Sequence, residues 1–521
     1  MKLNKISTYL LALVLLGLSA CTGRLDIADP NRLSSEQYYT TEAHAVAAVD
    51  AIYSLLMTDG FFQRVTPIYN DGRGDELRCR SPWNFMVSFS NFTIQSTTDG
   101  ALAIFWDSHF QMISRANQAL ENIPTITEVE PNLRQRLMGQ ALFLRAFSYF
   151  ELTNTQENPP LILETPKGAE SFYPSNADVT QQKVYDQVKA DLTEAIAMLP
   201  VNYNDVTGPD QGQVGRVTKG AAQSLLAMVY LYEGDYDSAL PLLQAVVNSN
   251  QYSLADNYAN MFTQDPAIEN ANPGRIFWAT FTTATGLENW GGDPNVNWRQ
   301  FLALTPTYSQ GDFFDFAPTQ FLYDEMRQER TIDGKLDPRY HATILSYEPD
   351  EGYTTAYGQD WLTRYGAGSE GQFYIKKYTN AVGGTDAFTS GFDYHIIRYA
   401  DVLLLYAECL ANTGNIPMAA QYVQQVRDRA NLPDREAEFA GYTLPQFMDQ
   451  LDHERIMELA IEGKRWWDIK RWGYLNDANK LAELKAHNAE FNTFTAGEDE
   501  FIPIFQGELD VNPNLVGNSA N

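Results

Sequence analysis

The sequence has little cysteine, with 3 residues in 521, which excludes a scaffold held together by disulfides. It is also short of basic residues, since 37 Lys and Arg stand against 66 Asp and Glu and the formal net charge is −29. A surface this negative repels the phosphates of nucleic acids and anionic lipids, so the composition disfavours both partners. By the same reasoning, it favours neutral or basic ligands over anionic polysaccharides.

Recognisable catalytic motifs are missing as well. The 6 histidines form no HExxH or Cys/His zinc spacing, and the sequence contains neither a GxSxG turn nor a GxxxxGK[ST] phosphate loop. A glycosidase pair of carboxylates stays open, because such acids are brought together by the fold and not by sequence spacing. We therefore expect a binding protein with no catalytic residue, cofactor or metal, with a glycoside hydrolase as the less favoured alternative.

Long hydrophobic runs are confined to the N-terminus. The run Leu10–Leu18 follows a short positive region and precedes two small residues and Cys21. This order is typical of a secretory signal peptide over residues 1–20, and it resembles a lipobox in which Cys21 becomes a lipidated N-terminus. An ordinary signal peptide with an incidental cysteine is the alternative. Farther along, the strongest apolar run is Ala400–Ala411, which contains two acids and does not predict a membrane span.

The sequence pattern predicts that the body of the chain is mostly helical and that loop-rich segments separate some of the helices. Apolar residues recur every three or four positions over Asn132–Leu152 and Gln181–Leu199, which predicts two helices that each bury one face. Between residues 257 and 394 the sequence is instead rich in Gly, Asn, Asp, Thr and aromatic residues, as is the stretch Asp59–Gly100. Long loop-rich inserts in a helical frame often carry function, so we expect the ligand there.

Two segments, 227–246 and 407–426, carry small and large residues at identical spacings, like a tetratricopeptide helix pair. Gly234 and Gly414 fall where the first helix of each pair must end, and glycine adopts the positive φ of such an end without strain. The repeat is degenerate and not in tandem. It therefore predicts separate helix hairpins and not a regular solenoid.

One segment, His453–Trp472, mixes basic and aromatic residues in the manner of a nucleic-acid site. However, Ile456 and Leu459 give it a core-facing stripe, and its acids lie at helical spacings from its bases. With the strongly negative net charge, this pattern favours a structural pair of helices with internal ion pairs and packed tryptophans.

This segment resembles the most recognisable motif of the SusD/RagB family of Bacteroidetes outer-membrane lipoproteins, which is similar to ERxxELxxEGxRWxDLxRW and is matched from Glu454 to Trp472. The resemblance extends essentially from Cys21 to Asn518. Six further family landmarks occur in order: Trp106–Ile123, Ala141–Leu152, Gly215–Tyr232, Ile397–Leu410, Val426–Pro433 and Phe501–Leu515.

The resemblance implies a mostly α-helical fold of four tetratricopeptide-like helix pairs that support a loop-rich ligand-binding region. It implies a single domain over residues 21–521, with halves 21–230 and 231–521 and the insert 257–394. The implied function is capture of an oligosaccharide or polysaccharide at the exterior of the outer membrane and its delivery to a SusC-like TonB-dependent transporter. The RagB side of the family leaves a peptide ligand as the alternative.

A sugar offers apolar C–H faces and a ring of hydroxyls, so its site needs exposed aromatic rings beside amide or charged groups. On this ground the candidate ligand-binding residues are Trp83, Asn84, Trp290, Trp298, Tyr308, Trp361, Asp71 and Arg73. Each aromatic residue could instead be a buried loop anchor, since large aromatic side chains are mostly buried. The other tryptophans are assigned to the frame: Trp106, Trp278, Trp466, Trp467 and Trp472.

Overall fold

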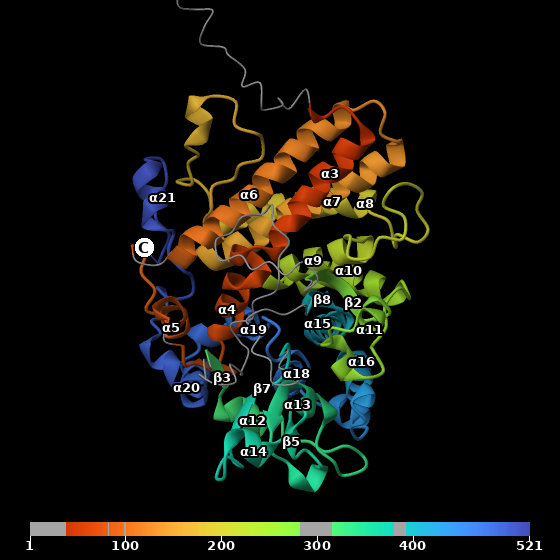
Figure 1. Ribbon diagram of the computed structural model, residues 1–521, viewed down its shortest axis with the longest axis vertical. Coiled ribbons are helices and arrows are strands. Elements are labelled where there is room, and N and C mark those ends of the chain that lie inside the picture. The colour runs from red at the N-terminus through yellow and green to blue at the C-terminus, as the bar shows by residue number, and fades with distance from the viewer. Residues whose placement is uncertain (1–37, 82, 98–99, 282–314, 380–391, 521) are drawn as a thin grey trace, which may run out of the picture.

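The computed structural model describes residues 38–81, 83–97, 100–281, 315–379 and 392–520. Five helices follow one another along the first half and pack each against the next (Figure 1). They are α6 (Gly100–Asn122), α7 (Pro131–Gln156), α8 (Gln181–Met198), α9 (Lys219–Tyr232) and α10 (Tyr236–Asn248). The two helices expected from apolar periodicity are confirmed as α7 and α8, and the mostly α-helical fold is confirmed as well.

The two expected helix hairpins are present, the first as α9 and α10 and the second as α15 (Tyr399–Asn412) and α16 (Ile416–Arg429). Gly234 and Gly414 end the first helix of each pair with φ of 72° and 88°, as predicted. The hairpins are not separate, however, because α10 packs directly against α15 although residues 249–398 lie between them in the chain. The helices thus form one continuous array across both halves.

Shorter elements complete the frame. Its strands form four antiparallel pairs: β1 (Leu77–Cys79) with β3 (Phe316–Pro318), β2 (Arg275–Ala279) with β8 (Tyr394–Arg398), β4 (Ile344–Ser346) with β7 (Phe373–Ile375), and β5 (Thr355–Ala356) with β6 (Gln359–Asp360). The remaining helices are α3 (Glu42–Tyr53), α4 (Val65–Gly72), α5 (Asn84–Ser90), α11 (Pro266–Asn270), α12 (Gln320–Glu325), α13 (Pro338–Thr343), α14 (Trp361–Tyr365), α17 (Glu436–Phe439), α18 (Leu444–Leu459), α19 (Arg465–Arg471), α20 (Ala478–His487) and α21 (Gln506–Val511).

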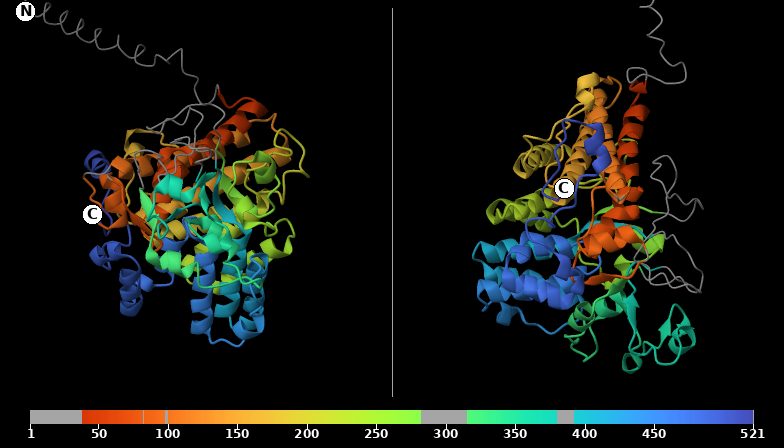
Figure 2. Two further views of the ribbon diagram at one scale, coloured as in Figure 1. Left: turned by 60° about the horizontal axis from the view of Figure 1, so that its bottom comes forward. Right: turned by 90° about the vertical axis from the view of Figure 1, so that its left-hand side faces the viewer.

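Most apolar side chains belong to one core that runs through helices of both halves. A second, small core surrounds Trp361 between β4, β7 and α14, at the end of the molecule opposite α3 (Figures 1 and 2). In the part of the chain that the structure describes, Glu42–Gln63 is apolar and long enough to cross a membrane. Most of it is buried inside the protein, where Ala45, Val49 and Ile52 pack into the main core.

The signature segment forms α18 and α19, and it carries a network of buried ion pairs. Glu458 is fully buried and accepts hydrogen bonds from Arg339, Arg398 and Arg429. Burial would raise the pKa of Glu458, but these three guanidinium groups outweigh it and hold the pKa well below its usual range. The expectation of pairing at helical spacings is therefore wrong for Glu458, because its partners come from other elements.

Gly463, in the turn between α18 and α19, shows why this motif needs a glycine. Its φ is 70°, and a Cβ atom there would lie 2.7 Å from the Tyr394 hydroxyl. Its N–H donates to Asp71 at 2.7 Å, which ties the turn to α4. The segment therefore acts as a structural joint between the two halves.

Candidate functional site

Trp83 and Asn84 lie on the surface at the start of α5, a helix that packs against α4 and β1 (Figure 1). The Trp83 side chain is 45% exposed. Its backbone N–H donates to the Ser81 hydroxyl at 3.1 Å, and its ring meets Phe85 edge-on at 6.2 Å. An indole held in this way beside an exposed amide offers a stacking face and a hydrogen-bonding group together.

Two arginines that sequence reasoning missed precede this pair. Arg78 lies in β1 and Arg80 directly follows the strand; both are exposed, whereas Cys79 between them is half-buried. The backbone of Arg80 donates to the carbonyl of Asp315 at 2.7 Å, which fixes the end of β1 against the chain that enters β3. The sequence does contain a signal that could have identified them: two arginines at positions i and i+2 are followed closely by Trp83 and Asn84.

Two acids lie behind this strand. The Glu490 carboxylate accepts the Cys79 N–H at 2.7 Å, and burial raises the pKa of Glu490 to about 7. Burial likewise raises the pKa of Asp315 to about 6. Glu490 is therefore partly protonated near neutral pH, whereas Asp315 is mostly ionised, so the two carboxyls together carry less than the charge of two full anions.

Asp71 and Arg73 are buried and do not present their side chains to a ligand. Asp71 binds the Gly463 N–H, and burial raises its pKa to about 7. The Arg73 guanidinium donates to the Asp499 carbonyl and lies 4.8 Å from the Trp466 ring centroid. This corrects the sequence-based expectation: both residues join α4 to the C-terminal elements.

Trp361 is also buried, at 0% exposure. Its indole N–H donates to the Ser369 hydroxyl at 3.0 Å, and its ring packs against Tyr365 and Tyr374. Trp361 is therefore a buried anchor, which is the alternative that the sequence left open for each aromatic candidate. Trp290, Trp298, Tyr308 and Cys21 lie outside the described residues. Of the eight candidates, the structure thus brings together only Trp83 and Asn84 at the surface.

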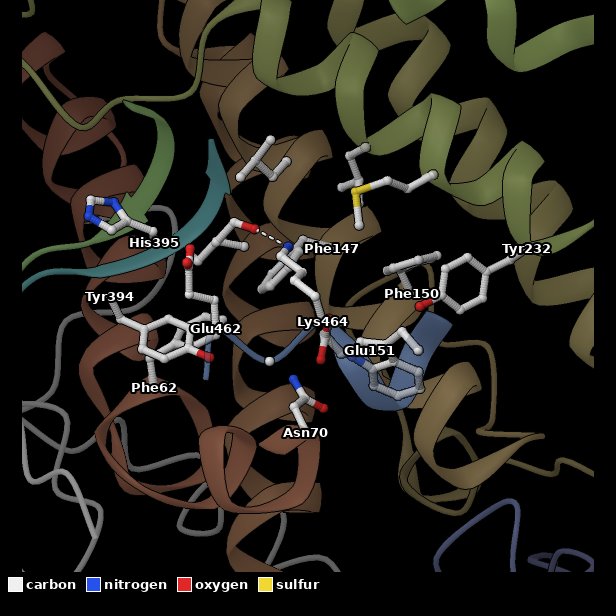
Figure 3. Close-up of a pocket in the computed structure, with 16 residues that line it drawn as sticks. Phe62, Asn70, Phe147, Phe150, Glu151, Tyr232, Tyr394, His395, Glu462 and Lys464 are labelled. Atoms are coloured by element: carbon white, nitrogen blue, oxygen red, sulfur yellow. Dashed lines mark hydrogen bonds between the residues drawn. The ribbon is translucent and has the colours of Figure 1, made fainter. Parts of the chain in front are cut away.

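An enclosed cavity of about 30 Å³ lies where α4, α7, β8 and the signature turn meet (Figure 3). Glu151, Asn70 and Tyr394 each have a buried polar atom on its wall without a hydrogen-bond partner. Lys464 also lines it and donates to the Ile396 carbonyl at 2.7 Å. A space of this size holds about one or two waters, which would satisfy these atoms, and it is too small for a sugar ring.

An open groove of about 220 Å³ lies on another face, between the α8–α9 connection and β2. Trp278 lines it, but the Arg275 guanidinium covers the indole at 3.9 Å from its centroid. Gly215 lies against the same ring, since a Cβ atom there would be 3.6 Å away. The indole is thus already stacked, in agreement with its assignment to the frame, and it is a poorer sugar platform than Trp83.

In the described part of the chain, no three His, Cys, Asp or Glu side chains gather to hold an ion. Cys79 and Cys409 are both free thiols. The surface at Trp83 offers an exposed indole, the Asn84 amide and the Arg78 and Arg80 side chains, which suit binding through stacking, hydrogen bonds and charge.

Two family models match the chain. The model described as the SusD family matches residues 273–520, and the model described as "Starch-binding associating with outer membrane" matches residues 39–231. The chain belongs to the SusD family. The resemblance seen in the sequence is thereby confirmed, and with it membership of a glycan-binding family associated with the outer membrane.

Relatives in the SusD family match along nearly their whole length. SusD-like protein P2 of Formosa agariphila is 27% identical, and the match covers 100% of this chain and 99% of that protein. A solved laminarin-binding SusD-like protein is also 27% identical, with a TM-score of 0.70 over 92% of this chain and 99% of that one. A SusD superfamily protein from Bacteroides vulgatus, 23% identical, shares the fold with a TM-score of 0.79 over 93% and 100% of the two chains.

Proposed function

We propose that this protein captures an oligosaccharide or polysaccharide and holds it at the surface formed by Trp83 and Asn84. The observation that carries the proposal is a 45% exposed indole beside an exposed amide, in a chain of a glycan-binding family. The laminarin-binding relative, 27% identical over nearly the full chain, supports the ligand class. Trp290, Trp298 and Tyr308 are proposed as further contacts on the strength of their sequence context alone.

The test is affinity electrophoresis of the mature chain in gels that contain single polysaccharides. We expect Trp83→Ala to weaken binding about tenfold, because loss of one stacking face removes about 1–2 kcal/mol. Tyr173→Ala is the matched control, since Tyr173 is likewise 45% exposed and lies beside the chain after α21, where its carbonyl accepts from the Asn514 side chain. Equal retardation of both variants and wild type would remove Trp83 from the site, and retardation by no polysaccharide would contradict the glycan ligand.

The same proposal includes delivery of the glycan to a SusC-like TonB-dependent transporter and anchoring at the cell exterior through a lipid on Cys21. The lipobox-like sequence and the family's association with the outer membrane support this arrangement. Purification from outer membranes in mild detergent should retain a large barrel protein, and Cys21→Ser should release the chain from the membrane. A wild-type chain that purifies alone would contradict the transporter partner, and peptides retained in place of sugar would favour the RagB-like alternative.

We further propose that the protein does not cleave its ligand. The sequence contains no nucleophile or metal signature, and its relatives are described by what they bind. Chromatography of a bound polysaccharide after prolonged incubation should show unchanged chain length. Release of shorter sugars would instead identify a glycoside hydrolase.

A further inference from the structure

Arg78 and Arg80 differ from the other arginines of this acidic chain. In the described residues, they alone among arginines are exposed and make neither a side-chain hydrogen bond nor an ion pair with any described residue. Arg330, which is also exposed, pairs with Glu351 at 3.0 Å. With 66 acids against 37 bases in the sequence, an acidic partner would be easy to supply, and yet Glu490, the described acid whose charge acts on Arg78, forms no ion pair with it.

The strand holds these two charges together. Arg78 pairs with Ala317 of β3, and the Arg80 N–H, one residue beyond β1, donates to the Asp315 carbonyl, so the paired, extended chain continues to Arg80. Residues at i and i+2 of such a chain point to the same face about 7 Å apart. Partial burial, together with the charge of Arg80, lowers the pKa of Arg78. Keeping two cations this close costs free energy, and an anion bound between them would offset that cost.

The neighbouring acids leave this strand positive. Glu490, in the segment after α20, interacts with the charge of Arg78, and its pKa is raised to about 7. The Glu490 carboxyl is therefore partly neutral near pH 7. The buried Asp315 carboxyl hydrogen-bonds Ser81, and although its pKa is raised to about 6 it is mostly ionised at pH 7. Salt at physiological strength screens exposed charges that lie more than about 8 Å away.

We propose that the ligand is an acidic glycan, whose carboxylate or sulfate groups bind Arg78 and Arg80 while a sugar ring stacks on Trp83. This inference rests on the proposed function and narrows its ligand class. Arginine binds planar anionic groups through two parallel N–H donors. Two residues separate Arg80 from Trp83, so their Cα atoms lie within about 11 Å. The local surface thus selects the charged ligand that the net charge of the whole chain disfavours.

The experiment compares each polysaccharide with its own neutral form. Affinity electrophoresis of the mature chain would use polygalacturonate and a sulfated galactan, alongside carboxyl-reduced and desulfated preparations of the same polymers. We expect one of the acidic polymers to retard the wild-type chain. Affinity should be at least tenfold weaker for the neutral form of that polymer, and also at least tenfold weaker when the double variant Arg78→Gln/Arg80→Gln meets the acidic polymer. The polymer that binds shows whether the anion is a carboxylate or a sulfate. Arg330→Gln, an exposed but ion-paired arginine, should leave retardation unchanged.

Four outcomes overturn the inference. Equal retardation by charged and neutral forms, with no effect of the double variant, removes the acidic ligand class but leaves glycan binding standing. Acidic binding that survives the double variant removes Arg78 and Arg80 from the site. If poly-glutamate binds equally well and the double variant loses this binding too, the strand recognises acidic peptides and not an acidic glycan. Retardation by no polymer contradicts glycan binding itself. Circular dichroism and thermal unfolding establish that each variant is folded.

Discussion

At the scale of single residues, buried charge holds the signature segment to β8 and to the chain that follows β7. Arg398 is 2% exposed and bonds both Glu458 and Glu462, while Lys377 bonds Glu462 at 2.9 Å. Ions removed from water in this way are stable only as a complete set, because any partner left alone keeps its full desolvation penalty. This is the physical reason why the signature motif is rich in Glu and Arg.

Removal of one guanidinium from this network should be costly. We expect Arg398→Met to lower the free energy of unfolding by about 3–5 kcal/mol, because Glu458 and Glu462 lose a buried counterion. Urea unfolding followed by tryptophan fluorescence measures the change. Arg330→Gln, at an exposed pair, should cost less than about 1 kcal/mol. Similar losses in the two variants would show that the network contributes little.

The cavity acid Glu151 should make stability depend on pH. Burial raises its pKa to about 7 in the folded chain, although Lys464 opposes this rise, whereas the unfolded chain keeps an ordinary value near 4.5. Between these values only the unfolded chain loses the proton, so the contribution of Glu151 to stability is present below about pH 4.5 and is lost as the pH rises to about 7. We expect the free energy of unfolding of Glu151→Gln to exceed that of wild type by about 2–3 kcal/mol at pH 8, and the two to be equal at pH 4. The same difference at both pH values would contradict this assignment.

At the scale of elements, the hairpins depend on two glycines. Gly414 has φ of 88°, and a Cβ atom there would meet nothing within 4 Å, so an alanine would suffer only backbone strain. We expect Gly414→Ala to destabilise by about 1–2 kcal/mol, measured as the shift in the urea midpoint. Gly371 has the same open surroundings without a positive φ, and Gly371→Ala should change stability by less than about 0.5 kcal/mol. Equal effects would exclude strain as the cause.

Local patterns predicted the elements that depend on local physics. The apolar stripes that became α7 and α8, and the glycines that end α9 and α15, depend on neighbours within a few residues. The packing of α10 on α15 joins segments separated by the whole insert, and no periodicity within either helix encodes it.

The same limit applied to the candidate site. Exposed and buried loop tryptophans have similar sequence surroundings, so Trp83 and Trp361 were indistinguishable before the fold placed them at 45% and 0% exposure. Asp71 and Arg73 were read as surface groups for the same reason. Arg78 and Arg80, in contrast, are exposed but were not among the sequence candidates. Whether an arginine has an ion-pair partner depends on its neighbours in three dimensions and not on sequence spacing.

At the scale of the whole molecule, two electrostatic effects of different range act on an acidic ligand. Far from contact the ligand meets a molecule of net charge −29 and is repelled. At contact it meets Arg78 and Arg80, beside Glu490, whose carboxyl is partly neutral near pH 7. Salt separates the two effects, because the screening length falls from about 30 Å at 0.01 M to about 10 Å at 0.1 M and long-range repulsion is weakened first.

The association rate constant of an acidic oligosaccharide should therefore rise severalfold between about 0.01 and 0.1 M NaCl. The dissociation rate constant should rise as well, because the arginine contacts are exposed and screened at high salt. Stopped-flow tryptophan fluorescence gives both constants, and the carboxyl-reduced ligand should show neither trend. Arg78→Gln/Arg80→Gln should speed dissociation while the association rate keeps its rise with salt, since the distant acids are untouched. An association rate that falls with salt would mean that the positive strand, and not the net charge, governs the approach of the ligand.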